Sequence, residues 1–152
     1  SAKNIALLTK SSFVRTAELI DSVLTTFADK FDPASSEIDI FGQLKQANLP
    51  QSVIQMALIN AQGDLWASNI AYPVTSVSLA DREHFRVFAD GTYQGLFISK
   101  PVIGRASHKW SVQFTRRFTN KDGSFAGVVV AASTRAGWPT VSSGQRSRRS
   151  DG

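Results

Sequence analysis

Two histidines, His84 and His108, set the limits on the catalysis or metal binding that the chain can support. Asp81, Glu83 and His84 form a cluster of metal-ligating residue types, and Asp81 and His84 are three positions apart, so they would share a helical face. A metal site needs further ligands at helical or turn spacing, and none stands beside this cluster. We therefore predict no metal site and no bound cofactor.

The patterns of common catalytic sites are also missing from the sequence. The chain has no cysteine, which excludes a thiol nucleophile and a disulfide scaffold. No serine lies in a nucleophile-elbow pattern, and Gly91, Gly95 and Gly104 do not form a phosphate-binding loop followed by a helix. The sequence predicts no catalytic residue and favours a protein that is not an enzyme.

Ligand binding has more support, because basic and aromatic residues are mixed around position 82. If residues 81–88 form a helix, Arg82, Phe85 and Arg86 lie on one side of it. Such a helix is either an ordinary solvated helix anchored by Phe85 or the lid of a small-molecule pocket. Arg105, in a later glycine-containing turn, would then line the mouth of the pocket.

The alternating segment at 110–118 contains a second unusual arginine. One face of a strand there would carry Trp110, Val112, Phe114, Arg116 and Phe118. A guanidinium on an apolar face is costly unless an acceptor pairs with it. Arg116 therefore either reaches solvent at the strand end or meets an anionic or polar ligand in a pocket.

Two helices are predicted at the start of the chain. The first spans residues 1–31 and ends before Asp32-Pro33, because a residue that precedes proline is displaced from helical geometry. It is longer than one small domain needs for its core, so it is either a core helix with a frayed start or a connecting helix. Ser35 or Ser36 caps a second, shorter helix. The apolar stripe of the first helix consists of Phe13, Ala17, Ile20, Leu24, Phe27 and Phe31.

The rest of the chain predicts an antiparallel sheet with one more short helix. Ser78 and Asp81 match a capping box that would open this helix from Asp81 to about Phe88. Tight turns join consecutive strands, so we predict an α+β fold in which a long N-terminal helix packs on a central antiparallel sheet of about five strands. The strand segments are 52–60, 64–69, 96–98 with 102–103 at an edge, 110–118, and 125–132 at the centre.

Composition and charge indicate one folded domain followed by a tail. The chain has 152 residues, of which 42% are apolar and 19% are charged, enough for one packed core. Four of the 17 basic residues follow Ser133, with one of the 12 acidic residues. We predict a domain over 1–133 and a flexible Arg/Ser/Gly-rich tail over 134–152. Because much of the basic excess lies in this tail, binding to nucleic acid is disfavoured.

Several of these segments together resemble the Cache domains, the PAS-like extracytoplasmic sensor domains (PDC domains) of bacterial receptors. The resemblance runs from about Phe13 to Ser133 and is nearest to the domains that precede GGDEF diguanylate cyclases or histidine kinase cores. It is carried by Asp81-Arg82-Glu83-His84-Phe85, Gly95-Leu96-Phe97-Ile98-Ser99-Lys100-Pro101-Val102, Trp110, and Asp122-Gly123-Ser124-Phe125-Ala126-Gly127-Val128-Val129-Val130.

The resemblance implies a ligand pocket and assigns positions to it. Arg82, His84 and Phe85 match the pocket helix, where amino-acid-binding members have an Arg-x-Trp-Tyr pattern, and Trp110 begins the strand of the pocket floor. Ser133 stands where those members place an aspartate for the ligand's ammonium group. A small carboxylate or other polar molecule is therefore expected rather than an α-amino acid.

The hypothesis is a periplasmic ligand-sensing domain of an inner-membrane receptor, with Arg82, His84, Phe85, Arg105, Trp110, Arg116 and Ser133 as ligand-binding residues. The receptor would reach the membrane only through segments outside this chain, and a homodimer would form through the N-terminal helix. The alternative is a cytosolic PAS-like protein-interaction module without a small-molecule ligand, which would expose a large apolar patch. A basic RNA-binding domain is a weaker alternative.

Overall fold

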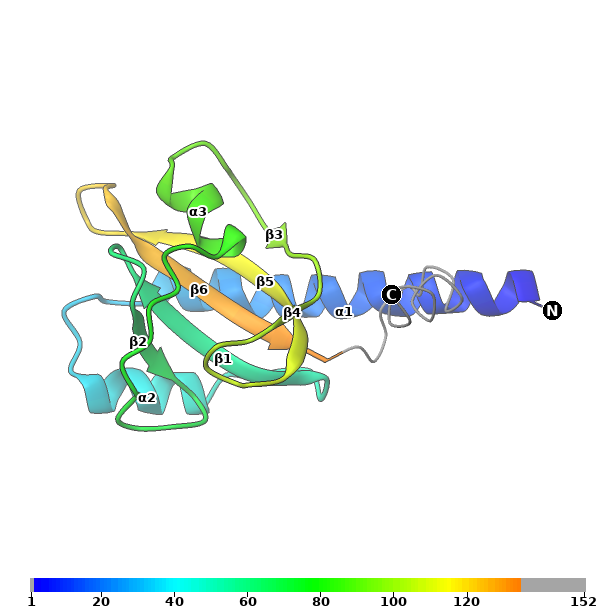
Figure 1. Cartoon of the computed structure of the whole chain (residues 1–152), viewed down its shortest axis with the longest axis horizontal. Helices are drawn as coiled ribbons and strands as arrows, with labels where there is room; N and C mark the ends of the chain where they lie inside the picture. Colours follow the sequence, from blue (N-terminus) through cyan, green and yellow to red (C-terminus); the bar gives the residue numbers. More distant parts are fainter. Residues whose placement is uncertain (1, 135–152) are drawn as a thin grey trace, which may run out of the picture.

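The chain is represented by a computed structural model that describes residues 2–134, with side chains from residue 12 onward. One antiparallel sheet forms the middle layer, with α1 (Ala2–Lys30) and α2 (Glu37–Lys45) on one face and α3 (Glu83–Ala89) on the other. Figure 1 shows α1 behind the sheet and α3 in front of it. This is the predicted α+β architecture. The domain boundary after Ser133 stays a prediction, and the predicted flexible tail lies, beyond Thr134, outside the described residues.

All strand pairs of the sheet are antiparallel, in the order β2-β1-β6-β5-β3, with β4 also paired to β5. β6 is central, as its nearly continuous apolar sequence predicts. The strands are β1 (Val53–Asn60), β2 (Leu65–Ser68), β3 (Phe97–Ile98), β4 (Val102–Ile103), β5 (Trp110–Thr119) and β6 (Phe125–Ser133).

The predicted long first helix is confirmed. At about 1.5 Å per residue, α1 is about 43 Å long, and its N-terminal part runs past the end of the sheet (Figure 1). Ile20 and Leu24 of its apolar stripe are fully buried against the sheet. The Ser36 hydroxyl accepts the Asp39 N–H at 3.3 Å, so the predicted cap of the second helix is also confirmed.

The third helix begins later than predicted, at Glu83, and the predicted capping box is wrong. Arg82 occupies the N-cap position and makes no side-chain cap hydrogen bond. The Asp81 carboxylate instead pairs with Arg105, and Ser78 forms a backbone bridge to Asp64. A stronger, charge-assisted partner from a distant segment thus replaces the local cap.

Gly63 fixes how the segment before α3 lies on the sheet. Its φ of 90° belongs to the left-handed region, and a Cβ there would stand 2.5 Å from the Cβ of Ala80. The Gly63 carbonyl oxygen accepts the Leu79 N–H at 2.7 Å. Only glycine allows this close approach, which holds the chain just before Arg82 against the turn between β1 and β2.

Candidate functional site

A cavity lies on the α3 face of the sheet, between the central strands and two covering segments. The first covering segment leads into α3 and includes Leu79, Arg82 and His84, and the second, at 102–107, consists of β4 and the start of the connection to β5. The free volume is about 30 Å³ when measured by the positions that the centre of a water molecule can take, which is room for about two water molecules. A cavity of this volume fits only a very small ligand.

Two glutamines form part of the sheet floor. Gln55 of β1 and Gln113 of β5 both pair in register with Ala132 of β6, so they lie in one row across the three central strands. The Gln55 Nε2 donates to the Ser68 hydroxyl at 2.9 Å, and the Gln113 Nε2 donates to the Ser111 hydroxyl at 2.7 Å. The remaining floor is apolar, formed by Ala57, Ile59, Leu65 and Val130.

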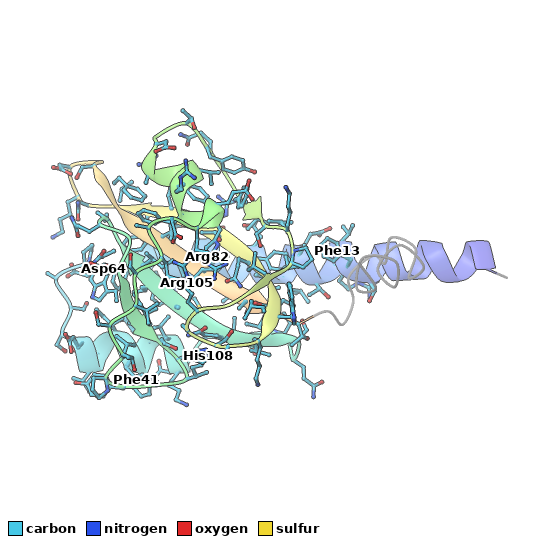
Figure 2. The ribbon with its side chains drawn as sticks, in the orientation of Figure 1. Phe13, Phe41, Asp64, Arg82, Arg105 and His108 are labelled. Atoms are coloured by element: carbon cyan, nitrogen blue, oxygen red, sulfur yellow. The ribbon has the colours of Figure 1, made fainter. Side chains whose placement is uncertain are left out.

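Two arginines lie side by side over this floor (Figure 2). Arg105 forms a bidentate ion pair with Asp81, with 2.7 Å between Nη2 and Oδ2, and donates to the Ser78 carbonyl oxygen at 3.0 Å. Hydrogen bonding to Arg105 lowers the pKa of Asp81 to about 2. The charge of Arg105 is therefore already matched by a carboxylate.

Arg82 has a different set of contacts. Its Nη2 donates to the Ile103 carbonyl oxygen at 2.9 Å, across the cavity mouth. Among the described residues, no carboxylate forms an ion pair with Arg82. A guanidinium has five N–H donors, so Arg82 keeps donors and an unmatched positive charge for an anion.

His84 lines the same cavity and is neutral at pH 7. Its side chain is 5% exposed. Burial, together with the nearby charge of Arg82, lowers the pKa of His84 from 6.5 to about 4. A neutral imidazole offers one donor and one acceptor, so His84 adds hydrogen-bonding capacity without further charge.

Three of the seven predicted site residues, Arg82, His84 and Arg105, come together at this cavity. Phe85 lies on the same face of the sheet but in the core beneath α3, with its ring centroid 6.0 Å from that of Phe125. It supports the helix that carries Arg82 and His84 and does not line the cavity.

The structure places the other three predicted residues away from the cavity. Arg116 faces α1, where its guanidinium forms two hydrogen bonds with Asp21, one of them 3.2 Å between Nη2 and Oδ2. Trp110 begins β5 but is 58% exposed. Ser133 is buried at the end of β6, with its hydroxyl 3.1 Å from that of Ser52. Arg116 of β5 thus pairs with a carboxylate of α1 and does not line the cavity.

The cavity residues with polar side chains that sequence reasoning missed are Gln55, Gln113 and Ser107. A signal was available for Gln113, because 110–118 has one apolar and one polar face. A polar strand face usually indicates solvent. Here Ser111, Gln113 and Thr115 are all buried, so the polar face indicates the cavity instead.

Taken together, the geometry suits a small anion. It supplies one unmatched guanidinium, a neutral imidazole, two amides and an apolar wall. Within the described residues, no three His, Cys, Asp or Glu side chains gather closely enough to hold a metal ion. In the same part of the chain, no helix has the length and apolar character needed to cross a membrane.

The fold is shared with solved extracellular and ligand-binding domains of a histidine kinase and of chemoreceptors. The extracellular domain of rpHK1S-Z16, assigned as a histidine kinase, matches with a TM-score of 0.67 and 26% identity over 86% of this chain and 55% of its own. The ligand-binding domain of the Pseudomonas aeruginosa PAO1 amino-acid chemoreceptor PctC, solved with GABA, matches with a TM-score of 0.66 and 14% identity over 86% and 61%.

A third match is the ligand-binding domain of the Pseudomonas fluorescens chemoreceptor CtaA, solved with L-alanine, with a TM-score of 0.62 and 15% identity over 86% of this chain and 57% of that one. No protein-family model and no curated protein sequence matches the chain. Of the three solved domains, the chain covers only 55–61% of the length. The predicted resemblance to Cache-type sensor domains is confirmed at the level of the fold.

Proposed function

We propose that this chain is an extracytoplasmic, non-catalytic ligand-sensing domain of a membrane-bound bacterial receptor. It binds a small polar or anionic molecule in the cavity between the sheet and the start of α3. The observation that carries the proposal is Arg82, a guanidinium without a carboxylate partner among the described residues, set over buried amides and a neutral His84. The fold supports it, because the matched structures are extracellular or ligand-binding domains.

Ligand binding is coupled to the rest of the domain through the segments that close the cavity. Arg82 and Arg105 tie β4 and the connection after it to the segment that leads into α3, through hydrogen bonds to the Ile103 and Ser78 carbonyl oxygens. An anion that contacts these guanidinium groups competes with those bonds. It shifts the closing segments by no more than its difference in affinity for their two arrangements.

The route to an output domain lies across the sheet. β5 carries Gln113 on the cavity face and Arg116 on the opposite face, where Arg116 pairs with Asp21 of α1. A change in β5 therefore reaches the long helix directly. The output domain in this proposal is a histidine kinase, as in one matched protein, or a diguanylate cyclase. Homodimerisation through α1 is part of the same proposal.

Thermal unfolding of the full chain against a panel of small carboxylates, amino acids and amines tests the binding function. A ligand at about 100 times its dissociation constant stabilises the native state by about 2.7 kcal/mol. Arg82→Ala should abolish the shift for the ligand class that binds. Arg86→Ala is the matched control, because Arg86 is an exposed arginine of the same helix outside the cavity lining.

A second candidate function, the protein-interaction module, is favoured by an apolar groove between α2 and the loop after β2. Phe41, Tyr72 and Pro73 line this groove, and the neighbouring Ile38 and Ile70 are about half exposed. This candidate predicts a well-folded chain whose unfolding temperature does not move with any small molecule of the panel. A shift that depends on Arg82 would exclude it as the main function.

A further inference from the structure

The first observation concerns charge in the cavity. Among the described residues, no acidic side chain lines it, while Arg82 and Arg105 do. The carboxylate of Asp81, which pairs with the cavity residue Arg105, has both of its oxygens bonded to that guanidinium. A ligand ammonium group would therefore enter without a counter-charge and beside the unmatched charge of Arg82. Burying an unpaired charge is strongly unfavourable.

The second observation concerns the floor opposite the arginines. Gln55 and Gln113 are both about nine-tenths buried, and each amide makes one side-chain hydrogen bond, to Ser68 and to Ser111 respectively. A glutamine amide has two donors and an acceptor oxygen with two lone pairs. Both amides thus retain donor and acceptor capacity at the cavity floor.

We propose, on the basis of the proposed function, that the ligand is a short carboxylate whose second polar group is uncharged, a hydroxyl or a keto oxygen. Its carboxylate binds Arg82, and Gln55 and Gln113 hydrogen-bond the second group. The two glutamines are therefore specificity-determining residues. The free volume of about 30 Å³ limits the ligand to a chain of very few carbon atoms.

Both the arginine side and the amide floor of the cavity distinguish the hydroxy acid from its analogues. A carboxylate without a second polar group leaves the buried amides short of a partner, which costs roughly tenfold or more in affinity, or about 1.4 kcal/mol or more. An ammonium group in place of the hydroxyl offers donors to the amides, but it brings a charge that nothing in the cavity matches. The hydroxy acid is thus preferred over both analogues.

Isothermal titration of the full chain with three ligands of nearly equal size tests this preference. L-lactate, propionate and L-alanine share a three-carbon carboxylate and differ in carrying a hydroxyl group, no polar group or an ammonium group. Glycolate, acetate and glycine form the same series one carbon shorter. We expect the hydroxy acid to bind roughly tenfold or more tightly than the other two members of each series.

Variants of Gln55 and Gln113 test whether the cavity floor causes the preference for the hydroxy acid. Gln113→Leu should make lactate and propionate bind with similar affinity, because the amide no longer distinguishes them. Gln113→Glu has nearly the same shape and adds the missing carboxylate, so it should weaken lactate and raise the affinity for alanine. Gln55→Glu is the second variant if Gln113→Glu does not fold. Gln62→Glu, at an exposed position in the turn between β1 and β2, is the matched control and should change nothing.

The outcomes separate this inference from the function on which it rests. If carboxylates bind and Arg82→Ala abolishes binding, but wild-type protein prefers alanine to lactate, the ligand class is wrong while the sensor function stands. If lactate is preferred and neither glutamine variant alters the preference, the glutamines do not determine specificity. If no member of either series binds the wild-type chain, the ligand class is overturned, and the binding function is overturned with it only if the thermal-unfolding panel also shows no shift that depends on Arg82.

Discussion

Both faces of the sheet are covered by chain, yet strand β5 presents opposite kinds of side chain to them. On the face under α1, β5 contributes Val112, Phe114 and Phe118, which are nearly fully buried. Aromatic rings meet there at close distances, with Phe31 and Phe118 5.0 Å apart between centroids. This face is a filled apolar core, in which each side chain contributes to stability through burial and packing.

On the face under α3, the same strand contributes Ser111, Gln113, Thr115 and Arg117. The Thr115 hydroxyl and the Arg117 Nε are buried without a hydrogen-bond partner in the described part of the chain. Buried polar groups and free volume both reduce stability relative to a filled apolar core. On the α1 face β5 thus adds to a filled core. On the α3 face its polar side chains lie beside an apolar cluster under the helix and lower stability while they provide groups for binding.

The largest expected effect is on the α1 face, from Phe114→Ala. Phe114 is 1% exposed, so its truncation leaves a cavity and should lower the free energy of unfolding by about 3–5 kcal/mol. Urea unfolding measures this loss. Ligand preference, measured well below the lowered unfolding temperature, should not change. An altered preference between lactate and propionate would show that the two faces do not have separate roles.

The second effect belongs to the cavity face and depends on pH. His84 has a pKa of about 4 in the folded chain, below its ordinary value of 6.5. Between these values the unfolded chain binds a proton that the folded chain does not, so the free energy of unfolding falls as the pH falls. From pH 7.5 to pH 4.5 this loss is about 2–3 kcal/mol.

Urea unfolding of wild type and His84→Gln at the two pH values isolates this contribution from that of the carboxylates. On acidification from pH 7.5 to pH 4.5, the free energy of unfolding of His84→Gln should fall by about 2–3 kcal/mol less than that of wild type. His108→Asn is the control, because His108 is exposed and asparagine tolerates its positive φ of 62°. Equal pH dependence in wild type and His84→Gln would mean that His84 is not held neutral by burial.

Sequence patterns predicted the elements of this fold because those patterns are local. The stripe from Phe13 to Phe31 has helical spacing, and the alternation in 110–118 and the apolar run in 125–132 have the spacing of strands. Tight turns between the strands then made an antiparallel sheet the simplest arrangement. Each of these signals extends over fewer than about 20 residues and needs no knowledge of distant contacts.

The cavity was only half predictable, because it depends on pairings between distant segments. Arg82 is the N-cap of the short helix that contains His84, so a local pattern brought them together. Gln55 and Gln113 meet only through the registers of β1 and β5 on β6. Arg116 was assigned to ligand binding because its partner, Asp21, lies 95 positions away in the sequence. The missed and misplaced residues are those whose partners come from another element.

The third effect tests the link between the two faces. Arg116 and Asp21 are both about one-third exposed and doubly hydrogen-bonded, and the pairing raises the pKa of Arg116. A double-mutant cycle with Arg116→Met and Asp21→Asn should give a coupling energy of about 1 kcal/mol at moderate salt. Ligand affinity should stay unchanged in both variants. A coupling energy near zero would mean that this pair does not tie β5 to α1.

The smallest expected effect on stability is also the sharpest test of the contrast between the faces. In the double variant Gln113→Leu/Ser111→Ala, both partners of a buried hydrogen bond become apolar, a change that is often neutral or stabilising. The Lys109 carbonyl oxygen loses a 3.5 Å contact from Ser111 but keeps its hydrogen bond from the Gly104 N–H at 3.0 Å. No buried partner is therefore stranded.

The free energy of unfolding should stay within about 1 kcal/mol of the wild-type value or rise, while discrimination between lactate and propionate disappears. Phe114→Ala is expected to give the reverse result, a large loss of stability with unchanged preference. A loss of several kcal/mol in the double variant would place this polar network among the interactions that hold the fold together. The cavity face would then differ from the α1 face in chemistry alone, and not in its role.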